Sequence, residues 1–317
     1  MSSPNPFVIF LIQVHDCALT ENYVVILDFP LTLRSRRFLT NSFPVEYEPE
    51  NGARIGLTSR MKGVGGTSST QWFDVESGVV LHAANAFERK DDGMVVVHGF
   101  KSVPKGTSSY ILDCTPAFLY EWILDPVTGK TVNERCLNPD VMVEFPQVQD
   151  KLVGRNADAV YGLAMTTIGG PLPFKTPEVG GVLDSAVKFA LEDNAASGVT
   201  AGDVIGRFDL PKGWHMVSEP TLVSKTGSDD DGVENNGHYV LLIVTYTPPS
   251  ATTNVDCGDD DQDNGYLEMA RDGKSMKSQF LVLDGDCISD GPVTTVDLPS
   301  HVNNGLHSTF LDWEKMK

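Results

Sequence analysis

Short apolar runs, each closed by turn-forming residues, recur along this sequence and limit the folds open to it. Val, Ile, Leu and aromatic residues fill the runs, and Gly, Pro, Asn or Asp stands at their ends. Runs of this length and composition are typical of β-strands. The clearest are Tyr23–Asp28, Gly93–Val97, Phe118–Leu124, His238–Tyr246 and Gln279–Leu283. The pattern predicts an all-β chain.

Two segments have local structure that can be read more closely. Aromatic residues occupy alternate positions over Phe118–Ile123, and the turn formers of Asp125–Gly129 follow at once, which predicts a β-hairpin. The best candidate for a helix is Val182–Glu192. Its apolar side chains at helical spacing are Val182, Ala186, Phe189 and Ala190.

The charge balance excludes some classes of partner. The chain has 317 residues with 24 Lys+Arg against 43 Asp+Glu, a formal net charge of −19, and 41% hydrophobic residues. That hydrophobic content can bury a large core. The negative charge repels phosphate backbones, so we expect no nucleic-acid partner. It also disfavours broad docking on anionic lipid, but leaves open a peripheral membrane contact through a local apolar patch.

Neither a membrane span nor a secretory signal is expected. The apolar stretch Phe7–Ile12 is far shorter than the roughly 20 residues that a bilayer requires. No Lys or Arg precedes it in Met1–Pro6. The cysteines are odd in number and scattered, which favours reduced thiols in an intracellular protein of the cytoplasm or a plastid. They are Cys17, Cys114, Cys136, Cys257 and Cys287.

Three polar segments invite a ligand-binding interpretation that their spacing does not support. Asp256–Gly265 has alternate Asp residues like a calcium loop, but its Gly falls one place late and Ala270 stands where the last Glu ligand is needed. Solvated surface loops are the better interpretation of this segment and of Ser228–Glu234. Gly63–Gly66 lacks the spacing of a phosphate-binding loop, so we expect a flexible loop.

Three of the seven histidines stand in segments of interest. His15 directly precedes a strand, His82 follows an apolar run, and His307 lies close to the C-terminus. Each taken alone is ordinarily a core or surface residue. A histidine that binds a metal must be neutral, and its second ring nitrogen needs an acceptor that fixes the tautomer and the ring orientation. A nearby carboxylate meets that need.

Taken together, the segments around these histidines resemble the carotenoid cleavage oxygenases. HDCALTENYVV at 15–25 is similar to the H-D-x-x-x-T-x-x-Y segment of that family, and Trp72-Phe73 with LHAANAFE at 81–88 is similar to its W-F and H-x-x-N-A-F-E segments. LPSHVNNGLHSTF at 298–310 resembles its ending. VEFP at 143–146 and SEP at 218–220 match two further segments, and all occur in the family's order.

The resemblance implies a fold and a metal site. The fold is a seven-bladed β-propeller with a helical lid, in which four histidines hold one Fe(II). By resemblance, His15, His82 and His307 are three of the four ligands. Glu144 and Glu219 match the outer glutamates that accept the imidazole N–H groups. We expect His301 to be structural, His98 to belong to the core, and His215 and His238 to lie at the surface or at strand edges.

The chain departs from the family at its beginning. The family's first iron-binding histidine precedes the segment matched by His15, and residues 1–14 contain none. We therefore expect an atypical N-terminal segment at 1–14 and, at 15–317, the C-terminal portion of a single propeller domain whose opening blades are missing. An incomplete translation explains this better than a shortened protein that has lost activity. Ser308 also replaces the usual Gly after the last ligand.

The resemblance also implies an activity. It is the O2-dependent cleavage of a carbon–carbon double bond in a carotenoid, apocarotenoid or stilbene-like substrate, giving two carbonyl products. Fe(II) is the implied cofactor, and a hydrophobic polyene or stilbene-like molecule and O2 are the implied partners. Two alternatives stay open: isomerohydrolase chemistry on the same iron, and a catalytically inactive propeller fragment that acts as a binding module.

Overall fold

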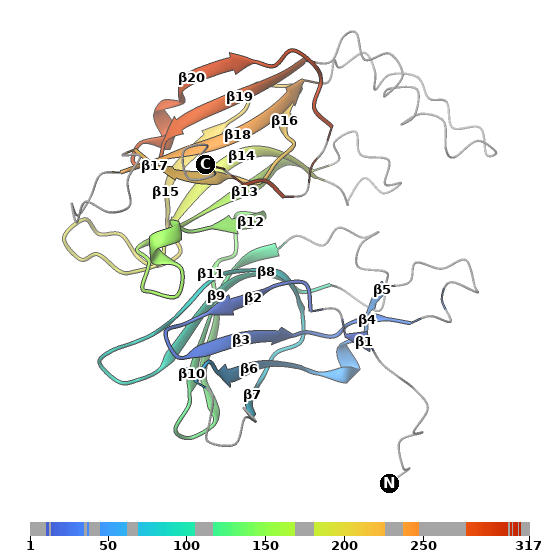
Figure 1. The fold of residues 1–317 in the computed structure, drawn as a ribbon, viewed down its shortest axis with the longest axis vertical. Coiled ribbons are helices and arrows are strands. Elements are labelled where there is room, and N and C mark those ends of the chain that lie inside the picture. Colours follow the sequence, from blue (N-terminus) through green and yellow to red (C-terminus); the bar gives the residue numbers. More distant parts are fainter. Residues whose placement is uncertain are drawn as a thin grey trace. The chain divides into compact units, whose positions relative to one another are not determined.

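The protein is described by a computed structural model in which nearly all regular structure is β (Figure 1). The described residues are 11–12, 14–34, 37, 45–61, 69–104, 117–168, 181–225, 237–246, 277–303, 305, 307–309 and 311. Their contacts divide the chain into two compact units. Unit 1 comprises Met1–Asp140 and Leu152–Asn156, and unit 2 comprises Val141–Lys151 and Ala157–Lys317. No helix in the described part is long and apolar enough to span a bilayer.

Unit 1 contains two four-stranded antiparallel sheets and a smaller three-stranded sheet. The first has the order β2-β3-β6-β7, with β2 (Cys17–Leu19), β3 (Tyr23–Asp28), β6 (Ala53–Ser59) and β7 (Thr70–Val75). The second is a simple meander of β8 (Val79–Glu88), β9 (Val95–Ser102), β10 (Ala117–Asp125) and β11 (Lys130–Asn138). The third pairs β1 (Leu11–Ile12), β4 (Leu31–Leu33) and β5 (Val45–Tyr47), and the 3-10 turn η1 (Pro49–Asn51) follows β5.

The core of unit 1 lies between its two larger sheets. Val25, Ile55 and Phe73 from the first sheet pack in one cluster with Val97 and Trp122 from the second. All five are fully buried. Burial of apolar side chains on facing sheets is the main force that holds such layers together. This packing brings β2 and β8, which carry the first two histidine segments, to neighbouring positions.

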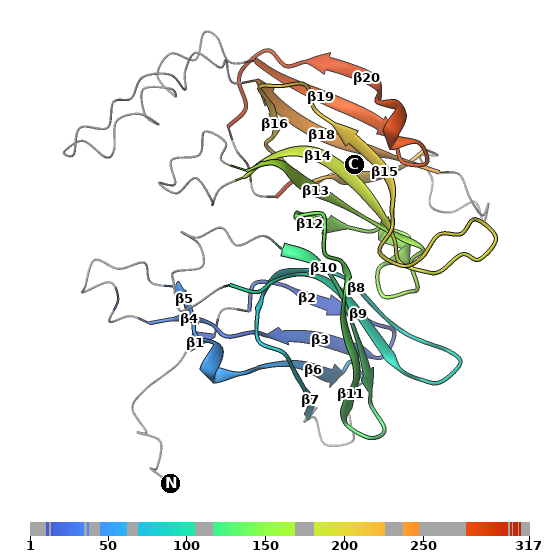
Figure 2. The same ribbon diagram turned by 180° about the vertical axis from the view of Figure 1, so that it is seen from behind.

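The described residues of unit 2 form two antiparallel sheets, seen from behind in Figure 2. One has β12 (Val143–Gln147), β13 (Ala159–Ile168), β14 (Gly181–Ala190) and β15 (Val204–Asp209) in sequence order. The other has the order β16-β18-β19-β20, with β17 also paired to β18. Its strands are β16 (Trp214–Met216), β17 (Thr221–Ser224), β18 (His238–Tyr246), β19 (Lys277–Asp284) and β20 (Pro292–Asp297). The 3-10 turns are η2 (Asp150–Leu152) and η4 (Ile288–Asp290).

The all-β prediction is confirmed, and the helix prediction for Val182–Glu192 is wrong. That segment forms the central strand β14, which pairs with β13 on one side and β15 on the other. Successive residues 185–187 are all buried, because both faces of a central strand are covered. A strand buried on both faces has a near-continuous apolar run, and such a run also fits a helical period.

Of the other sequence predictions about the fold, the structure tests the hairpin but not the polar loops or the single domain. The hairpin is present as β10 and β11, and the Asp125 carboxylate accepts the backbone N–H groups of Val127 and Thr128 in its turn. The segments Gly63–Gly66, Ser228–Glu234 and Asp256–Gly265 lie outside the described residues. The single domain expected over 15–317 stays a prediction.

The imidazole of His238 is buried in unit 2, so its predicted place at a surface or strand edge is wrong. Its Nε2 lies 2.7 Å from the Tyr161 hydroxyl, which donates to the Gly285 carbonyl at 2.5 Å. A proton on Nε2 is therefore donated to the Tyr161 oxygen. Burial, with a smaller contribution from the positive charge of Lys188, lowers the pKa of His238 to about 4.

This shift predicts that unit 2 loses stability in mild acid. Below the ordinary histidine pKa of 6.5 the unfolded chain takes up a proton at His238, whereas the folded chain does so only near pH 4. The free energy of unfolding should therefore fall as the pH drops through that window. His238→Gln keeps an N–H for Tyr161 but does not titrate, so urea unfolding should show a shallower decline. His215, whose pKa burial also lowers, titrates in both proteins. An unchanged decline in the variant would contradict the assignment.

Candidate metal centre

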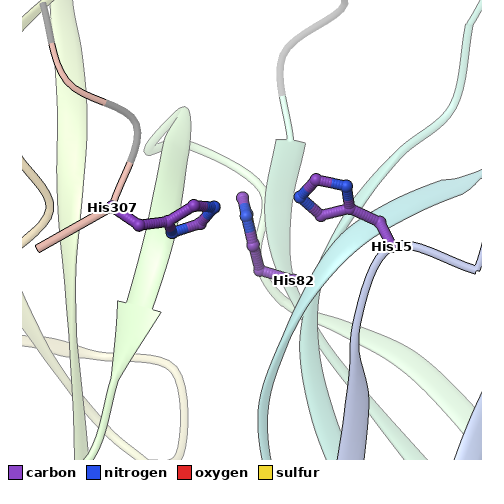
Figure 3. A group of neighbouring side chains, drawn as sticks. All are labelled: His15, His82 and His307. Atoms are coloured by element: carbon purple, nitrogen blue, oxygen red, sulfur yellow. The ribbon is translucent and has the colours of Figure 1, made fainter.

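The rings of His15 and His82 lie beside each other in unit 1 (Figure 3). His15 lies two residues before the edge strand β2 and is exposed, and His82 lies within β8 and is half-buried. Their ring centroids are 5.0 Å apart in an edge-to-face arrangement. A ring nitrogen of each lies within 4.8 Å of a ring nitrogen of the other. Two imidazoles at this separation can bind one metal ion, whose bonds to histidine nitrogen are about 2 Å long.

His82 stands in an irregular part of β8. Val80 pairs with Lys101 and Ala83 pairs with Gly99, so three steps along β8 correspond to only two steps along β9. A second shift follows between Ala83 and Asn85. Extra residues of this kind are β-bulges, which redirect side chains and release backbone groups from the ladder. His82 therefore lies in a part of β8 that departs from the regular alternation of the ladder.

Two sets of hydrogen bonds join the residues on either side of β2 to β8. The Asp16 carboxylate accepts the backbone N–H of Ala83 at 3.0 Å. The Glu88 carboxylate accepts the Thr20 hydroxyl at 2.6 Å and both the backbone and side-chain N–H groups of Asn22 at 2.7 and 2.8 Å. Burial raises the pKa of Glu88, but hydrogen bonds from Asn22 and Thr20 outweigh it, and the net direction is down.

Glu219 accepts a hydrogen bond from His307 in unit 2. Glu219 is 8% exposed, and its Oε2 lies 3.2 Å from Nδ1 of the exposed His307. Gln147 Nε2 donates weakly to the same oxygen at 3.4 Å. With its proton on Nδ1, His307 donates to the carboxylate and keeps Nε2 as an electron-pair donor. This is the arrangement that a metal-binding imidazole needs, because the carboxylate fixes the tautomer and increases the basicity of the other nitrogen.

The chain around His307 is held on the neighbouring loop by further hydrogen bonds. Ser308 donates its backbone N–H to Glu219 Oε1 at 2.7 Å, and its hydroxyl lies 3.0 Å from that of Thr221. The backbone N–H of Gly305 donates to the Val217 carbonyl at 2.7 Å. Glu219 thus holds both His307 and the residue that follows it. Ser308 stands where the family has Gly, but its hydrogen bond to the Glu219 carboxylate comes from the backbone N–H, which a glycine also has.

Glu144, the other predicted glutamate, lies next to a strained residue. Its Oε2 accepts the backbone N–H of Phe145 at 3.0 Å. Phe145 has φ = 58°, and among the described residues it is the one non-glycine with positive φ. The register of β12 shifts between Glu144 and Gln147. The Phe145 ring meets the His307 ring edge-on, with centroids 6.1 Å apart.

The remaining histidines lie apart from these groups. His98 is 2% exposed, which confirms its predicted place in the core, and its Nε2 lies 3.4 Å from Glu121. His215 belongs to β16 at the edge of its sheet, as predicted. His301 is half-buried. Among the described residues, only His15, His82 and His307 form a group that could hold a metal ion.

Histidine donors of this kind fit a transition metal such as iron. Imidazole nitrogen suits Fe(II), Zn and Cu, and a site of neutral histidines leaves the full positive charge on the metal. His15 and His82 in unit 1 and His307 in unit 2 each offer a ring nitrogen. Sequence reasoning missed Asp16, Thr20, Asn22 and Glu88, although all four lie in two of the segments that carry the resemblance, 15–25 and 81–88.

Comparison with known proteins identifies the chain. The family model described as retinal pigment epithelial membrane protein matches residues 6–312, which is nearly the whole chain. The chain belongs to this family. The carotenoid 9,10(9',10')-cleavage dioxygenase 1 of Pisum sativum is 26% identical over the whole chain and 52% of its own length. The apocarotenoid-15,15'-oxygenase of Synechocystis is 24% identical over 94% of the chain and 51% of its own length.

Solved structures confirm the propeller type of fold. A cobalt-substituted apocarotenoid oxygenase of Synechocystis matches with a TM-score of 0.65 and 21% identity, covering 94% of this chain and 52% of that one. An apocarotenoid oxygenase variant from the same organism matches with a TM-score of 0.66 and 20% identity, covering 95% and 53%. The chain spans about half the length of the relatives and structures that it matches.

The positive φ of Phe145 predicts an inverted order of stability for two substitutions. Both Phe145→Gly and Phe145→Ala remove the ring, but only Gly adopts positive φ without strain. Phe145→Gly should therefore be more stable than Phe145→Ala by about 1 kcal/mol in urea unfolding. Phe118 in β10 has ordinary φ. There Phe118→Gly should be less stable than Phe118→Ala by about 0.5–1 kcal/mol. If the Gly variant were less stable than the Ala variant at both positions, strain at Phe145 would be contradicted.

Proposed function

We propose that this protein acts as a non-haem Fe(II) dioxygenase that cleaves a carbon–carbon double bond of a carotenoid, apocarotenoid or stilbene-like substrate. The substrate double bond is broken by O2, and each of its two carbons receives one oxygen atom as a carbonyl. The observation that carries the proposal is the pairing of His307 Nδ1 with Glu219, because it leaves Nε2 oriented for a metal. The pairing of His15 with His82 supports it.

The proposed ligands are His15, His82 and His307, with Glu144 and Glu219 as the carboxylates that orient imidazoles. When bound, Fe(II) supplies the activation of O2. The chain's own part is to fix the tautomer and the orientation of the imidazoles. Glu219 does so by holding the proton of His307 on Nδ1 and fixing the backbone of Ser308. No general acid or base is required, because the metal and the electron-rich substrate carry the chemistry.

The relatives support the substrate class and the metal. Those of Pisum sativum and Synechocystis are named for the cleavage of carotenoids and the oxygenation of apocarotenoids. A matching structure is named as cobalt-substituted, which supports a metal site. The proposed partners are thus a hydrophobic polyene and O2, with no nucleic acid. The proposed location is the cytoplasm or a plastid, and two relatives of Arabidopsis thaliana are named chloroplastic.

Metal analysis tests the ligands. The full chain should copurify with iron, and His82→Ala should abolish its binding because one of the donors is lost. Glu219→Gln should weaken metal affinity roughly 10- to 100-fold, the usual effect of removing a carboxylate behind a ligand. His301→Ala is the control, since it removes an imidazole from the same C-terminal segment without removing a proposed ligand. Iron at full occupancy in His82→Ala would contradict the site.

Oxygen dependence tests the reaction. Incubation with carotenoid, apocarotenoid and stilbene substrates should give paired carbonyl products in air and none under anaerobic conditions, because both product oxygens come from O2. Chromatography with mass detection measures both products. Turnover that persists without oxygen would point to isomerohydrolase chemistry. A protein without stoichiometric iron and without products would be a binding module.

A further inference from the structure

The residues that directly follow His15 and His82 are hydrogen-bonded to each other. Asp16 follows His15, Ala83 follows His82, and the Asp16 carboxylate accepts the Ala83 backbone N–H at 3.0 Å. The other Asp16 oxygen accepts the N–H of Cys17 at 2.7 Å, the first residue of β2. One carboxylate therefore connects two segments that are 67 residues apart.

The geometry of β8 makes this bond available. In a regular antiparallel ladder each backbone N–H points either to the partner strand or away from it in strict alternation. The register of β8 against β9 shifts on both sides of Ala83. The bulges turn the Ala83 N–H toward Asp16, and they also turn the ring of His82, the preceding residue. The position of His82 and the bond to Asp16 thus depend on the same distortion.

His15 lies just outside the paired part of its sheet. It lies before β2, an edge strand of three residues whose pairing with β3 begins at Cys17. N-terminal to Cys17, the chain is no longer paired with β3. Asp16, the residue that follows the exposed His15, makes the hydrogen bond that connects this end of the chain to β8.

We propose that Asp16 is a positioning residue of the metal centre, which holds the His82 bulge of β8 against the His15 end of β2 and so sets the spacing of the two imidazoles. The inference rests on the proposed metal function. It assigns no contact between Asp16 and the metal. Its role is to hold two ligands at one separation before the ion arrives, which lowers the cost of ordering them on binding.

A second set of hydrogen bonds also connects the β2 segment to β8, so the effect of Asp16 on metal binding can be tested apart from its effect on folding. Thr20 and Asn22, at the other end of β2, donate three hydrogen bonds to Glu88 at the end of β8. Removal of the Asp16 carboxylate leaves these bonds in place. The two strands should therefore stay together in Asp16→Ala, while the ends that carry the histidines become free to move.

The test is a titration of the metal-free full chain with Co(II), followed by its visible absorption spectrum. Asp16→Ala should weaken Co(II) affinity roughly 10-fold and alter the spectrum, because the ligand geometry loosens. Asp16→Asn keeps one acceptor oxygen and should recover part of the affinity. The matched control is Asp125→Ala, which also removes a carboxylate that accepts backbone N–H groups, at the β10–β11 turn. It should lose stability and keep Co(II) affinity and spectrum.

A measurement without metal separates the two proposals. Amide hydrogen exchange at Ala83 should be slow in the wild type and faster in Asp16→Ala. If the wild-type protein binds no Co(II), the proposed function is contradicted. Faster exchange at Ala83 in Asp16→Ala would even then support the hydrogen bond between Asp16 and Ala83. Equal Co(II) affinity and spectrum in wild type and Asp16→Ala would overturn the role of Asp16, and unchanged exchange at Ala83 would do the same.

Discussion

An imidazole that binds a metal has to be neutral and held at one orientation, and the end of a β-strand provides neither condition by itself. In this protein carboxylates provide the second condition, the orientation. Glu219 holds His307 through Nδ1 and fixes the backbone of Ser308. Asp16 joins the chain next to His15 to the chain next to His82. Hydrogen bonds to charged carboxylates are stronger than those between neutral groups, which suits them to hold the ends of strands in place.

The irregular parts of the sheets lie beside these carboxylates. The bulges of β8 surround His82, and the positive φ of Phe145 stands next to Glu144 and opposite the His307 ring. Regular strands place side chains on alternate faces at a fixed spacing, which restricts where donor atoms can converge. The positive φ of Phe145 and the extra residues in the bulges of β8 depart from this regular geometry. Strain of this kind persists only where the surrounding structure holds it, and the core between the sheets does so here.

Much of the strand content was predictable because it depends on local composition. The bounds of Tyr23–Asp28 and His238–Tyr246 agree with β3 and β18, and the turn after Phe118–Leu124 agrees with its Asp, Pro and Gly residues. The error at Val182–Glu192 has a physical cause, since a central strand covered on both faces loses the alternation that distinguishes it from a helix. The error at His238 came from a partner, Tyr161, that lies 77 residues away.

The sequence by itself determined the β class, the family and the positions of His15, His82 and His307, because strand-forming residues and short motifs are local properties of the chain. The tertiary structure alone decided how the rings of His15 and His82 meet, which carboxylate serves His307, and that Asp16 and Glu88 join β2 to β8. These contacts depend on strand register and on bulges. Packing across a sheet sets both, and no short stretch of sequence contains that information.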